Sequence, residues 1–265
     1  MNVPRPIFPK EHGAWALLLV PMITAAWTAG AATLDLLLFV LGSISVFLAY
    51  LPVQNILRGH FVHDPHKVYQ ARFWAGLYLV VGLMFLVPLL FRRFFFIILF
   101  GVISVVAFLG NYFLTRRYGK TSSVDLLSVI GITVTGPSSY YIITGLLDLT
   151  ALLIWLINIL FFGFSVFYVR MKISAVASKK LGLSFGEKLQ LGKQTLLYLI
   201  LVSMAAPLLS IGGSTPLVRL FWFLPISIHS LWGTLTLSSD VKFKNLGFLL
   251  LGQSVLFSIL LGVVR

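Results

Sequence analysis

Long apolar stretches follow one another through nearly the whole of this 265-residue chain, and the charged residues fall almost entirely in the connections between them. A helix needs about 20 mostly apolar residues to cross the hydrocarbon core of a bilayer. Nine stretches of this kind are predicted, at residues 12–32, 35–57, 73–91, 94–114, 124–146, 149–171, 191–212, 216–237 and 245–264. The sequence therefore predicts a polytopic membrane protein.

The composition agrees with this reading, since 59% of the residues are hydrophobic and only 10% are charged. A soluble domain of this length needs a more polar surface. Backbone polar groups in lipid must be bonded within their own segment, and a transmembrane barrel would show short alternating strands. The predicted fold class is all-α, with a single integral membrane domain over residues 1–265.

The positive charges predict an orientation in the cell membrane. Of the 20 Lys and Arg residues, four lie on one side of the nine alternating spans (Arg92, Arg93, Arg219 and Arg265) and the other sixteen on the opposite side. The positive-inside rule places the N-terminus in the cytoplasm and the C-terminus outside. The net charge of +13 follows from the same arrangement. Because no basic soluble domain is present, nucleic acid is not an expected partner.

Polar residues recur on one face of two predicted spans, although polar groups inside a membrane are costly. The rows are Ser43, Tyr50, Gln54 and Arg58 in the second span, and Asn158, Ser165, Tyr168 and Lys172 in the sixth. Each row ends in a cation at the cytoplasmic side. Interhelical hydrogen bonds and a snorkelling basic residue explain either row alone. Two rows that end on the same side favour a polar pocket there.

The fifth predicted span is rich in small and hydroxylated residues around Pro137. Such a composition lets neighbouring helices approach closely, and the proline predicts a kink. In the eighth span, His229 stands beside Ser227 and Ser230. A packed, hydrogen-bonded histidine is the ordinary interpretation, although an ionisable group inside the membrane is also a candidate functional residue.

The cytoplasmic segment 55–67 holds three of the five histidines. His60, His63, Asp64 and His66 lack the spacing of a defined zinc motif, and Pro65 interrupts the helical register, so a metal site is not predicted. The chain has no cysteine, which excludes thiolate ligands and disulfides. A phosphate-type anion bound by the basic residues of this segment fits the composition better.

The first span opens with Lys10, Glu11 and His12 after Pro9. Helix initiation explains Pro9 and Glu11, because proline suits the first turn and an acid suits the positive end of a helix. Initiation does not require Lys10 and His12, which lie on the cytoplasmic side with the two long loops. They are therefore candidates for binding a ligand.

Three motifs resemble the YwiC-like family of bacterial membrane proteins. They are PKEHGAWALLLVP at Pro9–Pro21, the RRYGK…DLL…G…YYIITG pattern from Arg116 to Gly145, and SVFYVRMKI at Ser165–Ile173. The first motif is specific, and together they spread through most of the first 175 residues. The resemblance implies a membrane protein and assigns no reaction.

The layout of the whole chain also resembles the UbiA superfamily of intramembrane prenyltransferases. That resemblance implies nine helices with the N-terminus inside, and catalytic segments at the cytoplasmic ends of spans two and six. UbiA enzymes carry Asp-rich motifs there, which hold magnesium against an isoprenyl diphosphate. The corresponding segments here read QNILRGHFVHD and SVFYVRMKI, with Asp64 as their single acid. Magnesium is therefore not required by this sequence.

The resulting hypothesis is a divergent UbiA-like protein whose cytoplasmic cavity holds a lipid-like substrate with an anionic head, such as an isoprenyl diphosphate or another lipid phosphate. Cations would replace the metal and stabilise the departing charge. The resemblance implies catalytic roles for Arg58, His60, Tyr168, Arg170 and Lys172. The candidate substrate-binding residues are Lys10, His12, Gln54, Asn55, Arg116, Arg117, Asn158 and Ser165.

Two other interpretations remain open from the sequence. A transporter or lipid-binding protein without chemistry would use the same cations, although transporters commonly show internal repeats, and none is recognised here. A structural or assembly partner in the membrane would bind no ligand. An enzyme consumes its ligand, a transporter moves it and a scaffold ignores it.

Overall fold

The computed structural model describes residues 6–9, 12–59, 64–178, 182–209 and 215–263, with the side chain of His12 left out. Within these residues the chain forms helices and connecting turns and contains no strand, so the predicted all-α class is confirmed. The α-helices are α1 (His12–Ala29), α2 (Leu34–Leu57), α3 (Pro65–Phe91), α4 (Phe96–Tyr118), α5 (Ser122–Thr133), α6 (Thr135–Thr144), α7 (Leu149–Ala177), α8 (Phe185–Ala205), α9 (Pro216–Leu235) and α10 (Phe243–Val263), and a 3-10 turn, η1 (Ala206–Leu208), follows α8.

Seven helical segments in the described residues are long and apolar enough to cross a membrane, and Gly13–Ala29 forms a shorter apolar helix. The total of nine spans and the orientation of the termini stay predictions. Several helices extend beyond the predicted spans. The longest extension begins α3 at Pro65, because Asp64 accepts a hydrogen bond from the backbone N–H of Lys67 at 3.2 Å and proline suits the first helical turn.

The predicted kink in the fifth span is present. α5 ends at Thr133 and α6 begins at Thr135, and the two helices together form the membrane segment Ser122–Thr144. Pro137 has no N–H to bond the carbonyl of Thr133, and its ring collides with that carbonyl in a regular helix. The break therefore falls four residues before the proline.

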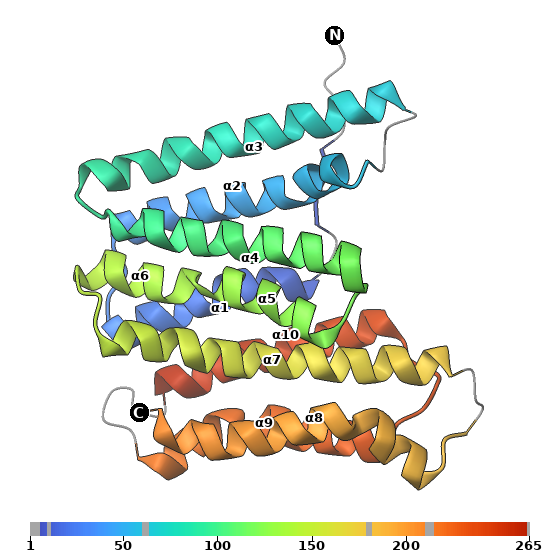
Figure 1. The fold of residues 1–265 in the computed structure, drawn as a ribbon. Coiled ribbons are helices and arrows are strands. Elements are labelled where there is room, and N and C mark those ends of the chain that lie inside the picture. Colours follow the sequence, from blue (N-terminus) through green and yellow to red (C-terminus); the bar gives the residue numbers. More distant parts are fainter. Residues whose placement is uncertain (1–5, 10–11, 60–63, 179–181, 210–214, 264–265) are drawn as a thin grey trace.

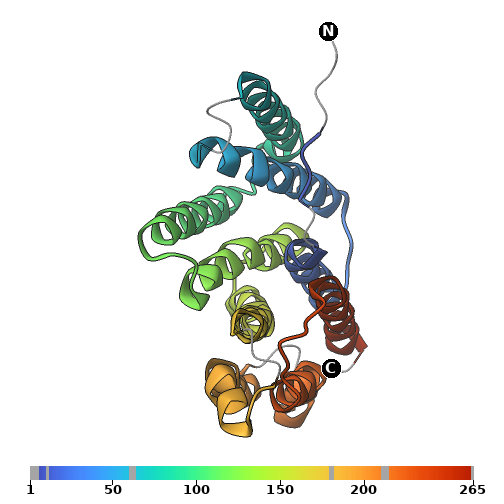
Figure 2. The same ribbon diagram turned by 90° about the vertical axis from the view of Figure 1, so that its right-hand side faces the viewer.

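The helices lie side by side with their axes roughly aligned (Figure 1). Figure 2 views them from the end predicted to face the cytoplasm. Helices that follow one another in sequence mostly pack together, and α10 returns to pack against α1. α1 also packs against α6, and α5 and α6 pack directly against α7.

Small residues permit the close packing of α1 on α6. A Cβ added at Gly136 would lie 3.3 Å from the Cβ of Pro21 and 3.1 Å from Ile154. The hydroxyl of Thr135, the residue before Gly136, donates a hydrogen bond at 3.1 Å to the carbonyl of Leu18, which lies one turn before Pro21 on α1. Small residues that bring membrane helices together and hydroxyls that bond across them are typical of membrane interfaces.

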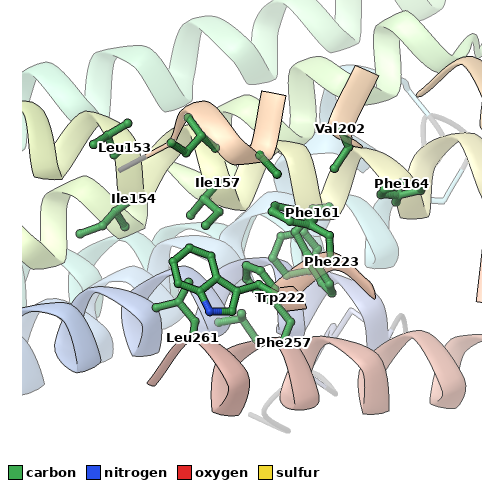
Figure 3. Packing of buried hydrophobic residues seen from close by; sticks show 14 of the residues in the cluster. Leu153, Ile154, Ile157, Phe161, Phe164, Val202, Trp222, Phe223, Phe257 and Leu261 are labelled. Atoms are coloured by element: carbon green, nitrogen blue, oxygen red, sulfur yellow. The ribbon is translucent and has the colours of Figure 1, made fainter. Parts of the chain in front are cut away.

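The main core joins α1 to the helices α7 to α10 (Figure 3). Trp222, Phe161 and Phe257 are among its largest fully buried side chains, and the last two rings stack with centroids 4.0 Å apart. A smaller core joins α1, α2 and α6 to the adjoining ends of α3 and α4. Large apolar side chains such as Met84 (69% exposed) and Val106 (63% exposed) cover the outer faces of α3 and α4 and would contact membrane lipids.

Candidate functional site

The C-terminal end of α2 is hydrogen-bonded to α4. The hydroxyl of Tyr112 on α4 donates to the carbonyl of Leu57 at 2.7 Å, and Arg116 donates through Nη1 to that hydroxyl at 3.4 Å. Within α2, Gln54 donates through Nε2 to the hydroxyl of Tyr50 at 3.0 Å, one turn apart on the same face. Two members of the polar row predicted on the second span are therefore bonded to each other near this contact.

Aromatic rings extend this contact toward the membrane interior. The rings of Tyr50 and Phe108 meet edge to face with centroids 5.3 Å apart. We call Tyr50, Gln54, Arg58, Tyr112 and Arg116 the α2–α4 cluster. It combines hydrogen-bonding groups, rings and two cations at the ends of two helices.

The cations of this cluster have no acidic counterpart. Arg58 and Arg116 are exposed, and so is Arg117, whose guanidinium lies over the Tyr118 ring at 5.2 Å from the centroid. No carboxylate in the part of the chain that the structure describes forms an ion pair with any of the three arginines. Arginine binds carboxylate and phosphate oxygens through paired N–H donors, so these groups are available to an anion.

The predicted row on the sixth span begins with an interhelical hydrogen bond. Asn158 of α7 is fully buried and donates through Nδ2 to the Thr24 hydroxyl of α1 at 2.9 Å. Its Oδ1 atom has no partner among the described residues. Ser165 is half-buried farther along α7. The contact with Thr24 favours the structural interpretation for this part of the row.

The cytoplasmic end of the same row packs against α9. Tyr168 fills the space beside Gly233, where an added Cβ would lie 2.0 Å from the tyrosine Oη. Lys172 donates through Nζ to the carbonyl of Gly233 at 3.1 Å, and Lys188 of α8 donates to the carbonyl of Leu235 at 3.3 Å. Lysines near a helix C-terminus stabilise its unpaired carbonyls. Lys172 therefore already caps α9.

Arg170 is engaged with a partner that sequence reasoning missed. It donates through Nε to Oδ2 of Asp125 on α5 at 2.8 Å, and its Nη2 atom forms an ion pair with the same oxygen. The two residues are far apart in sequence, so no local pattern joins them. The available signal was the position of Asp125 just inside a predicted span, where an acid calls for a basic partner.

The two predicted rows belong to helices with different neighbours. α2 packs mainly on α3, whereas α7 packs on α8, α5 and α6. In the described part of the chain, no hydrogen bond or ion pair joins a residue of one row to a residue of the other. A single pocket lined by both rows stays a prediction.

Of the remaining predicted site residues, some lie in the described part of the chain and some do not. Lys10 and His60 lie outside the described residues, and so does the side chain of His12, although its backbone begins α1. Asn55 is half-buried next to Gln54. Among the described residues, no three His, Asp or Glu side chains come close enough to hold a metal ion.

The fold and its lipid-facing helices define a multi-pass, all-helical membrane protein. Comparison with known families identifies the family within this class. The chain belongs to the YwiC-like family, since the family model described as YwiC-like protein matches residues 8–140.

It is 31% identical over 167 residues to the Uncharacterized protein YwiC of Bacillus subtilis (strain 168). That alignment covers 63% of this chain and 66% of the relative, so the chain spans just under two thirds of the relative's length. No solved structure gives a significant match. The resemblance to UbiA enzymes stays a prediction.

Proposed function

We propose that this protein binds a lipid-like molecule with a phosphate or diphosphate head at the cytoplasmic end of the α2–α4 cluster in the cell membrane. Arg58 and Arg116 would bind the head, and the rings of Tyr50 and Phe108 would lie beside the start of its chain. The observation that carries the proposal is that neither arginine forms an ion pair with a carboxylate of the described residues. Unpaired cations at a membrane surface attract anionic head groups.

The other candidate cations already have hydrogen-bond or ion-pair partners, which also favours the α2–α4 cluster as the anion site. Arg170 is paired with Asp125, and Lys172 is bonded to the carbonyl of Gly233. Binding an anion at either would disturb an existing contact, whereas the Arg58 side chain has no ion pair among the residues that the structure describes. The α2–α4 cluster is therefore the better site for the predicted anionic ligand.

The family match gives a second support. Residues 8–140 run from the segment before α1 into α6, and they include the whole α2–α4 cluster. Tyr168 and Lys172 lie outside the matched residues. A function common to the family is better placed in the helices that the family model covers.

A head bound in this way would not need magnesium. Arginine pairs neutralise phosphoryl oxygens directly and provide directed N–H donors. The Tyr112 hydroxyl, which donates to the carbonyl of Leu57 and accepts from Arg116 at 3.4 Å, would hold that guanidinium beside the bound head. Prenyl transfer, which the UbiA resemblance implies, would require those arginines to stabilise the departing diphosphate.

The test is ligand-induced stabilisation of the purified protein in nanodiscs, with farnesyl diphosphate and phosphatidic acid as probes, in the presence of a chelator. The probes should stabilise the wild-type protein and should lose at least about tenfold in affinity in the R58Q/R116Q variant, since two charge-assisted contacts are removed. R93Q is the matched control, because Arg93 is exposed, forms no ion pair with a described residue and lies on the side predicted to face away from the cytoplasm. Equal binding by wild type and R58Q/R116Q would refute the site.

Release of diphosphate separates the two classes of function that remain. A transferase should release diphosphate from an allylic diphosphate when an acceptor is supplied, and R58Q/R116Q should abolish the release. Binding without release would favour the alternative, a transporter or lipid-binding protein without chemistry. Failure to bind any of the probes would favour a structural or assembly partner in the membrane.

A further inference from the structure

The middle of α9 carries a histidine that the proposed function does not use. The ring of His229 meets the Tyr168 ring of α7 edge to face, with centroids 5.0 Å apart. Its Nε2 atom is buried and has no hydrogen-bond partner among the described residues. Ionisable groups inside a membrane are costly and mark functional positions such as proton sites.

Lys172 lies against the same tyrosine ring. Its Nζ atom is 5.3 Å from the Tyr168 centroid, and it is the atom that donates to the carbonyl of Gly233. Lys172 is close enough to His229 for the two groups to interact electrostatically. A proton on His229 would therefore place a second positive charge beside the lysine ammonium, with an aromatic ring and little water between them.

The helices around His229 offer little to offset that second charge. α7 contributes Tyr168 and Lys172, and the ionisable residue of α10 is a further cation, Lys244, near its start. α8 contributes Lys188, which bonds the end of α9, the exposed Lys193, and Glu187, whose carboxylate accepts from the backbone N–H of Ser184 in a capping box. Movement of one cation away from the other would relieve the repulsion.

We propose that His229 is a proton-binding site, and that its protonation drives the Lys172 ammonium off the carbonyl of Gly233 and loosens the cytoplasmic end of α9. Of the two groups the lysine is the one that can move, because its long side chain is half-buried near the helix end. Once the ammonium leaves, the last turn of α9 loses one of the two lysines that cap it. The α2–α4 cluster takes no part in this change.

Hydrogen–deuterium exchange in nanodiscs tests the site at about pH 4.5 and about pH 8, a range wide enough to protonate a histidine that is buried beside a cation. After correction for intrinsic exchange rates, wild-type amides in the segment 231–236 should exchange about fivefold faster at the lower pH, the factor that one lost hydrogen bond provides. The H229Q variant should show no such rise. K172Q should exchange fast at both values.

Two results would overturn the proposal. One is a pH-dependent rise in H229Q equal to that of the wild type. The other is a rise that persists in K172Q, which also serves as the decisive variant should H229Q fail to fold. The R58Q/R116Q variant should keep the full effect, so failure of the proposed anion site and failure of this proton site are separate outcomes.

Discussion

The ion pair between Asp125 and Arg170 decides whether Arg170 is a ligand-binding cation or a tie between α5 and α7. The side chains are 35% and 21% exposed, so the pair is neither on the surface nor fully enclosed. Exposed pairs contribute about 0.2–1 kcal/mol, and removal of one partner from a fully buried pair costs about 3–5 kcal/mol. Discounting for solvent screening, we expect a coupling energy of about 1–2 kcal/mol.

A double-mutant cycle measures that coupling. D125N, R170Q and D125N/R170Q should be compared with the wild type by unfolding in mixed detergent micelles, where the free energy of unfolding is read from the transition. Each single variant should be destabilised, and the double variant should be more stable than the sum of the single effects predicts. A sum of single effects that matches the double variant within about 0.3 kcal/mol would refute the structural role of the pair.

The same variants also report on binding. If the α2–α4 cluster holds the anionic head, R170Q should lose stability and retain its affinity for farnesyl diphosphate and phosphatidic acid. If R170Q instead has wild-type stability and a lower affinity for the probes, Arg170 belongs to the binding site, as the sequence predicted.

Two smaller predictions concern packing and pH. Gly233→Ala should lower the free energy of unfolding by about 1–3 kcal/mol, because its Cβ would lie 2.0 Å from Oη of Tyr168. Gly247→Ala, whose Cβ meets nothing within 4 Å, is the matched control and should leave stability unchanged or slightly higher in the same detergent titration. At the start of α3, the hydrogen bond from the Lys67 ammonium and, after it, the capping bond from the Lys67 backbone N–H hold the pKa of Asp64 below its ordinary value of 3.8. A lowered pKa means that this cap contributes fully above the ordinary pKa and is lost as the pH falls through the lowered one. Amide exchange in the first turn of α3 should therefore rise at acid pH in the wild type and show no such dependence in D64N, and an equal rise in both proteins would contradict the assignment.

Features that depend on neighbours along one helix could be predicted from the sequence. The spacing of Tyr50 and Gln54 placed them on one face, and they are hydrogen-bonded there. Pro137 predicted a kink, and the helix breaks before it. Both follow from helical geometry and covalent structure alone, which act over a few residues.

Features that depend on which helices meet could not be predicted in the same way. The sequence suggested that small residues in the fifth span allow close approach, and Gly136 does lie close to a neighbour. Nothing in the spacing identified that neighbour as Pro21 of α1. The spacing likewise could not identify Asp125 of α5 as the partner of Arg170, because the pair depends on the packing of α5 against α7.

α1 is hydrogen-bonded to two helices that come much later in the chain. The Thr135 hydroxyl of α6 donates to the carbonyl of Leu18, 117 residues earlier, and Asn158 of α7 donates to the Thr24 hydroxyl, 134 residues earlier. Because both partners follow α1 by more than a hundred residues, α1 can form these hydrogen bonds only after α6 and α7 have themselves been made. The first helix of the chain is therefore among the last to reach its final contacts.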